Sequence, residues 1–305
     1  MKRAACIGEC MIELRADSRD IYRLGFAGDA YNTAVYLKRS APDLEVEFCT
    51  VTGRDPLSRE MRRRWQEEQI RDSRAAAVDD RNPGLYLIET DERGDRRFHY
   101  WRKESAASLW WRKLGPRGVQ RLCAECDLVY LSGISLAILP PEERREALAA
   151  FRRQRGRGAR IAFDPNLRLR LWETVQEARS VIEEAIATAD VVLPSAQDMD
   201  ELYGAAAMET HADRLRKSGV REFALTSDIA GCWVYDGELR NIPQAETVTA
   251  VDTTGAGDAF NGAYLGARLQ GLGAGDAARS GMRLASRVVA HVGAIVPVGV
   301  EMPGK

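Results

Sequence analysis

The chain has 305 residues, 45% of them hydrophobic, which is enough to bury a large core in one α/β domain with a small appendage. Its 44 Lys and Arg residues almost cancel its 45 Asp and Glu residues, so the overall charge does not favour a nucleic-acid partner. Glu9 and Glu13 interrupt the first apolar run, and no segment approaches the ~20 apolar residues of a membrane span. We therefore expect a cytoplasmic protein without nucleic-acid or membrane partners.

Short apolar runs alternate with longer amphipathic segments along the chain. Helical patterns such as those at residues 140–154 and 177–189 separate these runs. Alternation of this kind is typical of an α/β fold with a mostly parallel sheet flanked by helices on both faces. The runs that we expect to form buried strands of this sheet are residues 4–9, 46–53, 127–133, 159–164, 190–194 and 222–226.

Two regions depart from this rhythm. Residues 11–25 and 83–102 are polar at alternate positions and are typical of strand–turn–strand units, the second with residues 92–95 (ERGD) as its turn. No internal repeat or Pro- or Ser-rich linker divides the chain. We therefore expect one domain over residues 1–305, with a small β-sheet lid from about residues 10–25 and 84–108.

Two clusters of side chains have ordinary structural explanations. Cys123 and Cys126 form a C-x-x-C pair, but the sequence has no second such pair and its three histidines lie far apart, so buried reduced thiols are expected rather than zinc. The basic run at residues 62–64 is interleaved with glutamates at helical spacing, which indicates a solvated helix face.

The segment VDTTGAGDAF at residues 251–260 is the strongest local signal. A Walker loop requires a lysine after its last glycine, and a dinucleotide fingerprint requires a small residue where this chain has Phe260, so neither motif is present. The glycines lead directly into a helix that we expect to start near Asp258. Several unpaired backbone N–H groups would then point at one spot in front of that helix, where an anion would bind.

Asp258 itself admits two interpretations. It can simply cap the helix, since aspartate is a favoured residue at helix starts. It can also act as a general base, because a carboxylate beside a bound phosphate is repelled by it unless it accepts a proton from the attacking hydroxyl.

This segment resembles the C-terminal signature of the ribokinase-like (PfkB) sugar kinases. The likeness extends over essentially the whole chain, through GFAGDAYNTAVYL at 25–37 and FDPNLRLRLW at 163–172 to GAIVP at 293–297. Within the family, the segments at 7–14, 83–102 and 130–139 indicate 2-keto-3-deoxygluconate as the sugar substrate. The resemblance implies a ribokinase-like fold and phosphoryl transfer from ATP.

The resemblance also implies the roles of individual residues around the reacting groups. Asp258 would be the base, the amides of Gly255, Ala256 and Gly257 would form the anion hole, and Asp252 would help to organise a monovalent cation such as K⁺. The positions that match the substrate-binding part of the family are Gly28, Asp29, Asn32, Tyr86, Tyr100, Arg102 and Arg168. Alternation along a strand predicts that Tyr100 and Arg102 face one side and Trp101 the other.

The nucleotide half of the resemblance is less regular. Ser195 and Asp198 stand where many relatives have Asn and Glu, which keeps a shorter acidic group for a water-mediated contact with Mg²⁺. Asp228 stands where a glycine normally lets the backbone approach ATP, which favours altered nucleotide binding. The full set of positions that the resemblance assigns to ATP is Asn166, Ser195, Thr226, Ser227, Asp228, Gly231, Gly255 and Gly257.

We therefore expect an ATP- and Mg²⁺-dependent sugar-acid kinase that converts 2-keto-3-deoxygluconate to its 6-phosphate, with an apolar lid face that favours a homodimer. Two alternatives remain open. One is a sugar kinase with another acceptor, such as fructose, ribose or a related keto-deoxy acid. The other is a nonenzymatic sugar-acid sensor on a kinase scaffold, which the aspartate in the nucleotide loop suggests.

Overall fold

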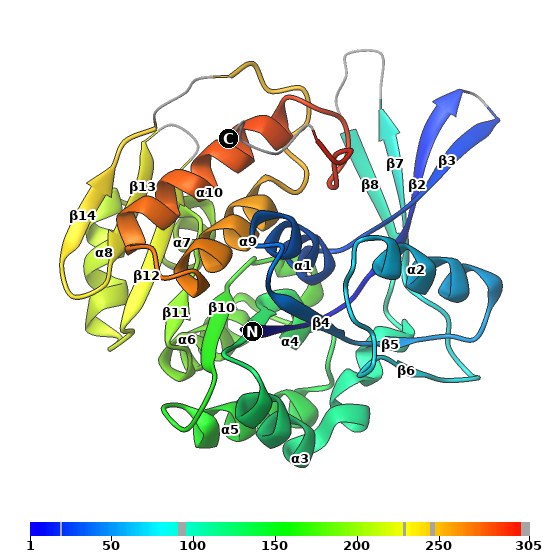
Figure 1. Ribbon diagram of the computed structural model, residues 1–305, viewed down its shortest axis with the longest axis horizontal. Helices are drawn as coiled ribbons and strands as arrows, with labels where there is room; N and C mark the ends of the chain where they lie inside the picture. Colours follow the sequence, from blue (N-terminus) through cyan, green and yellow to red (C-terminus); the bar gives the residue numbers. More distant parts are fainter. Residues whose placement is uncertain (19, 91–95, 228–229, 245–247, 300–305) are drawn as a thin grey trace.

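The computed structural model describes residues 1–18, 20–90, 96–227, 230–244 and 248–299. A central sheet runs through the molecule with helices on both of its faces, and a smaller second sheet projects at one end (Figure 1). The arrangement is the α/β architecture that the alternating apolar runs predict.

The central sheet has eight strands in the order β14-β13-β12-β11-β10-β9-β1-β4. The strands from β12 to β4 in this order are parallel, and β13 and β14 add an antiparallel edge. The bounds in chain order are β1 (Arg3–Ile7), β4 (Glu45–Cys49), β9 (Leu128–Ser132), β10 (Arg160–Asp164), β11 (Val191–Val192), β12 (Glu222–Ser227), β13 (Gly231–Tyr235) and β14 (Leu239–Ile242).

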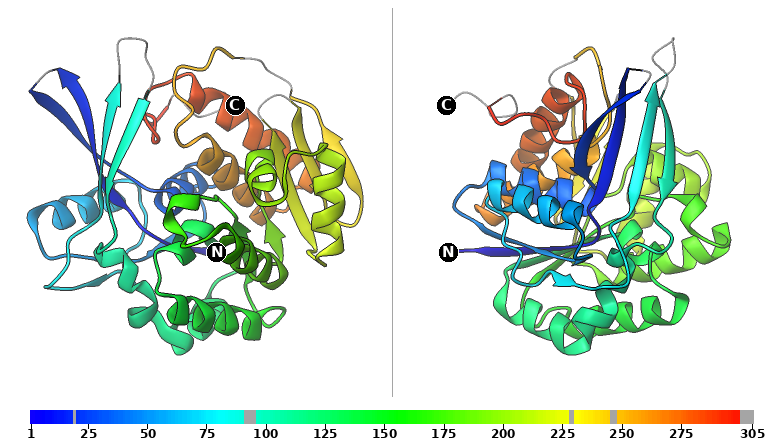
Figure 2. Two further views of the ribbon diagram at one scale, coloured as in Figure 1. Left: turned by 180° about the vertical axis from the view of Figure 1, so that it is seen from behind. Right: turned by 90° about the vertical axis from the view of Figure 1, so that its right-hand side faces the viewer.

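The helices cover this sheet in two layers. Helices α1, α2, α9 and α10 share one hydrophobic cluster on one face, whereas α3 and α5 to α8 share another on the opposite face. Figure 2 separates the blue and orange helices from the green ones. The bounds are α1 (Asp29–Ser40), α2 (Pro56–Glu67), α3 (Trp110–Glu125), α4 (Gly133–Ala137), α5 (Pro141–Gln154), α6 (Val175–Thr188), α7 (Ala196–Tyr203), α8 (Met208–Lys217), α9 (Ala256–Leu269) and α10 (Ala274–Val289).

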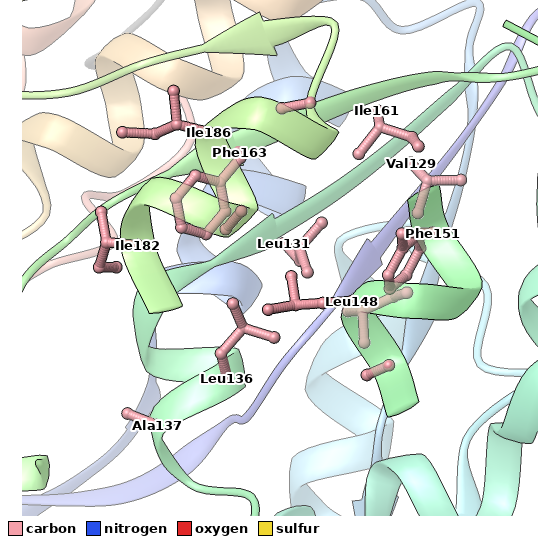
Figure 3. Packing of buried hydrophobic residues seen from close by; sticks show 14 of the residues in the cluster. Val129, Leu131, Leu136, Ala137, Leu148, Phe151, Ile161, Phe163, Ile182 and Ile186 are labelled. Carbon is pink, nitrogen blue, oxygen red and sulfur yellow. The ribbon is translucent and has the colours of Figure 1, made fainter. Parts of the chain in front are cut away.

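The central strands are apolar throughout because both of their faces are covered. In β9, Val129 and Leu131 pack in the cluster with α5, whereas Leu128 and Tyr130 pack in the cluster with α1 and α9. Figure 3 shows Val129 and Leu131 beside Phe151 of α5. A strand buried on both faces needs apolar residues at consecutive positions, which is why the sequence shows continuous runs here.

The second sheet has the order β3-β2-β7-β8, in which β2 pairs parallel with β7 and the outer pairs are antiparallel. It is built from the two segments where strand–turn–strand units are expected, although the expected turn at residues 92–95 lies outside the described residues. A further two-stranded sheet pairs β5 with β6. The bounds are β2 (Met11–Ser18), β3 (Ile21–Ala27), β5 (Val51–Thr52), β6 (Ala76–Ala77), β7 (Leu85–Thr90) and β8 (Arg96–Trp101).

The sequence-based prediction differs from the structure in two places. The run at 46–53 divides into β4 and β5, which belong to different sheets, and the antiparallel strands β13 and β14 were not expected. All six cysteines are free. Within the described ranges, no helix is long and apolar enough to span a membrane, and no group of three or more His, Cys, Asp or Glu side chains is arranged to hold a metal ion.

Candidate active site

A cleft of about 660 Å³ lies at the carboxyl ends of the parallel strands, where the second sheet faces the central one. Ligand sites in open α/β sheets occur at this edge. Most of the residues that the sequence assigns to a site line this cleft: Gly28, Asp29, Asn32, Tyr86, Tyr100, Arg102, Asn166, Arg168, Ser195, Thr226, Gly255, Gly257 and Asp258.

The glycine loop before α9 has the geometry of an anion site. Gly255 is the N-cap residue with a left-handed φ of 79°, and a Cβ there would come within 2.5 Å of the Ala294 carbonyl oxygen. Only glycine fits both conditions. The helix begins at Ala256, two residues earlier than expected, so Gly257 and Asp258 lie in its first turn, where backbone N–H groups have no partner within the helix.

The Asp258 carboxylate is held by the start of a second helix. Asn32 in the first turn of α1 donates its side-chain N–H to Asp258 Oδ2 at 2.8 Å, and its own amide oxygen accepts the Gly28 N–H at 3.2 Å. Helices α1 and α9 pack directly against each other. Two helix N-termini therefore meet at this carboxylate, and both carry partial positive charge.

The surroundings of Asp258 tune its acidity. It is half-buried, and desolvation together with the nearby Asp29 carboxyl group raises its pKa to about 7, against the opposing effects of Asn32 and Arg168. A base with a pKa near the operating pH combines sufficient basicity with sufficient ionisation. The capping interpretation finds no support in the side-chain contacts, since the N-cap residue of α9 is Gly255 and no side chain caps it.

Two further carboxyl groups, those of Asp29 and Asp164, lie near Asp258. Burial raises the pKa of Asp29, and burial and neighbouring aspartates raise that of Asp164. Asn166, at a positive φ of 32°, donates its side-chain N–H to Asp29 at 3.2 Å and its backbone N–H to Asp164 at 3.0 Å. Asn261 of α9 donates to Asp164 at 2.8 Å, so amide groups from two elements hold these acids in place.

Aromatic rings from the second sheet form the opposite wall. Tyr86 of β7 stacks on Tyr100 of β8 with ring centroids 5.7 Å apart, and Phe98 lies 6.3 Å from both. The Tyr86 hydroxyl donates to Glu13 of β2. Tyr100 and Arg102 line the cleft while Trp101 is 60% exposed, as strand alternation predicts.

Three arginines gather at this wall. Arg102 is buried and forms an ion pair with Glu9, a carboxylate with no exposed surface at the end of β1. Arg168 and Arg170 flank the start of a 3₁₀ turn, η2 (Leu169–Leu171), and both are exposed to the cleft. Burial and the charges of Arg170 and Arg168 lower the pKa of Arg102, so the cationic groups are close enough to interact.

The residues assigned to the nucleotide are divided between two places. Ser195 caps α7 with Asp198, and Asp198 also accepts the Leu167 N–H at 2.7 Å, which leaves it buried at the cleft. Ser227 and Gly231 pair with each other in the β12–β13 hairpin and are not among the residues found to line the cleft. Asp228, the departure expected to affect ATP binding, lies outside the described residues.

Asp252 organises the backbone behind the glycine loop. Its carboxylate accepts the N–H groups of Thr254 at 2.9 Å and Gly293 at 2.6 Å. The neighbouring Ala294 carbonyl accepts the Tyr36 hydroxyl at 2.8 Å. This network fixes the segment at 293–294 against which Gly255 packs.

Several site residues have no counterpart in the sequence-based assignment. They are Glu9, Glu13, Asp164, Asn261 and Arg170, each of which lines the cleft or contacts a residue that does. Asp164 and Arg170 lie within FDPNLRLRLW, so proximity to Asn166 and Arg168 was the available signal. The sequence contained no signal for Glu9, because its partner Arg102 is far away in the sequence.

The fold is that of the ribokinase-like kinases, with a second sheet over a cleft whose floor is the start of α9. Residues 1–299 match the pfkB family carbohydrate kinase, and the chain belongs to this family. It is 40% identical over 303 residues to 2-dehydro-3-deoxygluconokinase of Dickeya dadantii (strain 3937), with 97% of each chain covered.

Two other similarities agree with this assignment. The 2-dehydro-3-deoxygluconokinase of Escherichia coli (strain K12) is 39% identical over 302 residues, again with 97% of each chain covered. The structure of aminoimidazole riboside kinase from Salmonella enterica, complexed with aminoimidazole riboside and an ATP analog, superposes with a TM-score of 0.82 at 22% identity. That superposition covers 96% of this chain and 95% of the other.

Proposed function

We propose that the protein is a 2-dehydro-3-deoxygluconokinase, which transfers the γ-phosphoryl group of ATP to the 6-hydroxyl of 2-keto-3-deoxygluconate. The observation that supports an acidic acceptor is the group of arginines that lines the same cleft as Asp258, in a chain that is 33–40% identical to several kinases of this name. A neutral sugar has no need of such a cationic wall, whereas guanidinium groups match a carboxylate.

Asp258 is the proposed general base. It accepts the proton of the attacking hydroxyl, while Asn32 holds the carboxylate in position. The N–H groups of Gly255, Ala256 and Gly257 at the start of α9 would stabilise the charge on the oxygens of the transferred phosphoryl group, the Ala256 N–H by exchanging its bond to the Thr253 carbonyl oxygen for one to the phosphoryl group. Positioning and charge stabilisation supply most of the rate in such transfers.

The sugar acid is proposed to lie between the start of α1 and the second sheet. Gly28, Asp29 and Asn32 would bind its hydroxyl groups, and the rings of Tyr86 and Tyr100 would cover its carbon chain. Arg102 and Arg168 would face its carboxylate. This orientation places the acid at the arginine wall and the hydroxyl at the far end of the molecule beside the base.

The nucleotide is proposed to occupy the side of the cleft formed by the start of α7 and the end of β12, near Asn166, Ser195 and Thr226. Mg²⁺ bound to the triphosphate of ATP would compensate the negative charge of the phosphates. Asp198 is the acidic side chain that fits a water-mediated contact with it. Asp252, whose oxygens already hold two backbone N–H groups, would organise a K⁺ site by ordering its loop.

The second sheet is proposed to act as a lid and as a dimer interface. Closure over the sugar would exclude water that otherwise hydrolyses ATP. The strand register places Tyr22, Leu24 and Trp101 on the face away from Tyr100, and all three are at least 48% exposed. A second copy of the chain would cover these apolar side chains.

A substrate panel with coupled ADP detection tests the proposed function. The panel contains 2-keto-3-deoxygluconate, fructose, ribose and a related keto-deoxy acid, each with ATP and Mg²⁺. We expect the highest kcat/KM on 2-keto-3-deoxygluconate. Higher activity on fructose or ribose would refute the proposed acceptor, and calorimetric binding of the sugar acid without binding of an ATP analogue would indicate a sensor.

A further inference from the structure

Arg170 lies at the junction of the two sheets. It belongs to η2, which follows β10 of the central sheet, and its guanidinium carbon lies 3.9 Å from the ring centroid of Tyr100 in β8 of the second sheet. Both residues line the cleft. This cation–π contact connects the segment after β10 of the central sheet to the second sheet.

Arg102 has an acidic partner, whereas Arg170 has none in the described part of the chain. Arg102 is 7% exposed and paired with the fully buried Glu9, so part of its charge is compensated inside the protein. Arg168 donates to the Leu167 carbonyl at 2.8 Å, and its charge acts on Asp29 and Asp258. Among the described residues, Arg170 forms no salt bridge, and its side chain is exposed to the cleft.

Tyr100 receives two guanidinium groups. Arg102 lies 5.6 Å from its ring centroid, and Arg170 lies closer. The ring also stacks on Tyr86. An exposed arginine held on an aromatic face has few accessible rotamers, so less conformational entropy is lost when it binds an anion.

From these contacts we propose that Arg170 is a specificity residue for the acid end of the substrate: it supplies the uncompensated positive charge at the lid end of the cleft and holds Tyr100 over the bound sugar acid. The inference rests on the proposed function. It assigns to Arg170 a role in binding the carboxylate, and it assigns no role in the transfer of the phosphoryl group.

The test compares Arg170→Ala and Arg170→Lys with the wild-type enzyme, with Arg145→Ala on the solvent face of α5 as the control. Arg170→Ala should raise KM for 2-keto-3-deoxygluconate about 10- to 100-fold, because a charged hydrogen-bonding partner of the carboxylate is lost. Its kcat should change by less than about threefold, since Asp258 and the α9 amides remain. The KM of Arg170→Lys should lie between those of the wild type and Arg170→Ala, because lysine keeps the charge and loses the planar stacking.

The role of the ring contact is measured separately. Tyr100→Phe keeps the aromatic face and Tyr100→Leu removes it, so only the second should raise KM for the acid through this contact. If Arg170 and Tyr100 act together, KM for the acid should rise less in the double variant Arg170→Ala/Tyr100→Leu than the product of the two single fold-increases in KM. A purely multiplicative result would overturn the proposed coupling.

Calorimetric titration with the sugar acid in the absence of ATP gives a readout of binding alone. Weaker binding by Arg170→Ala with unchanged thermal stability is expected, and unchanged affinity and KM would overturn the assignment. Equal losses on the acid and on a neutral sugar would also overturn it. Failure of the wild-type enzyme to phosphorylate the acid would instead contradict the proposed function.

Discussion

At the scale of single residues, Asp258 shows how the surroundings set the acidity of a carboxyl group that we propose as the general base. Two helix N-termini and Asn32 favour its ionised form, whereas desolvation and Asp29 favour the protonated form. The second influence prevails and raises the pKa to about 7. Small changes of pH near neutrality should therefore change the fraction of active enzyme.

Asp258→Asn tests the base directly. Asparagine keeps the size of the side chain and an oxygen for Asn32 but cannot accept the hydroxyl proton, so we expect kcat to fall by about 10²–10⁴-fold. In the wild type, kcat/KM should decrease as the pH falls below about 7, because Asp258 becomes protonated. Steady-state rates from pH 5.5 to 9 measure both effects, and near-normal turnover of the variant would support a capping role.

The same substitution, Asp258→Asn, should increase the stability of the protein although it decreases kcat. A carboxyl group whose pKa is raised on folding binds its proton more tightly in the folded state, so the wild type loses stability as the pH rises from about 4 to about 7. Asp258→Asn removes this loss and should raise the free energy of unfolding by roughly 1–2 kcal/mol at pH 8, after allowance for screening by cleft water. Urea unfolding at pH 8 and pH 4.5 should show a gain only at the higher pH.

Substitutions of the cleft arginines should separate effects on substrate binding from effects on the stability of the fold. Arg102→Ala and Arg168→Ala should each weaken kcat/KM for the sugar acid by roughly 2–4 kcal/mol and affect neutral sugars much less. Only Arg102→Ala should also destabilise the fold, by about 3–5 kcal/mol, because it leaves Glu9 buried without its partner.

The control for this comparison removes both charges. Glu9→Leu/Arg102→Met should recover much of the stability lost in Arg102→Ala, measured by urea unfolding, while binding of the acid stays weak. A double variant as unstable as Arg102→Ala would show that the loss comes from packing and not from the unpaired Glu9 carboxylate.

At the scale of elements, the glycine loop and α9 depend on one backbone contact. Gly255→Ala introduces a Cβ within 2.5 Å of the Ala294 carbonyl oxygen at a φ of 79°, so we expect about 2–4 kcal/mol of destabilisation and loss of activity. Gly257→Ala is the matched control, because its Cβ would meet no atom within 4 Å. Thermal unfolding should distinguish the two variants, and equal melting temperatures would contradict the argument.

Prediction from sequence worked best where one physical cause dominates. Continuous apolar runs identified the parallel strands because covered strands must be apolar on both faces. The same runs did not reveal that β4 ends at Cys49, since a change of sheet alters the pairing partner and leaves the apolar pattern intact. The glycine loop could be identified because Gly255 has a left-handed φ and a close backbone contact that only glycine allows.

The site residues that the sequence did not predict depend on contacts between distant segments. Glu9 and Arg102 meet only when the second sheet folds against the central one, and Arg170 meets Tyr100 for the same reason. Neither contact leaves a local pattern of spacing or composition. Arg168 was identified from the family resemblance, whereas Arg170, two residues later in the same segment, was assigned no role.

At the scale of the whole molecule, the second sheet has one face toward the cleft and one toward solvent. If a second copy covers the solvent face, Leu24→Glu or Trp101→Glu should convert a dimer to a monomer, since a buried unpaired carboxylate opposes association. Light scattering during gel filtration measures the mass. An exposed-surface control, Arg145→Glu on α5, should leave it unchanged, and a wild-type monomer would contradict the proposed interface.

The contact between Tyr36 and Ala294 joins segments 258 residues apart. A ribosome releases the amino-terminal part first, so Asn32 and even Asp258 are synthesised before the backbone that supports Gly255 exists. The anion site is completed only when the chain has grown beyond residue 294. A nascent chain shorter than this therefore carries Asp258 and its amide partner without the finished loop, and we expect it not to consume ATP.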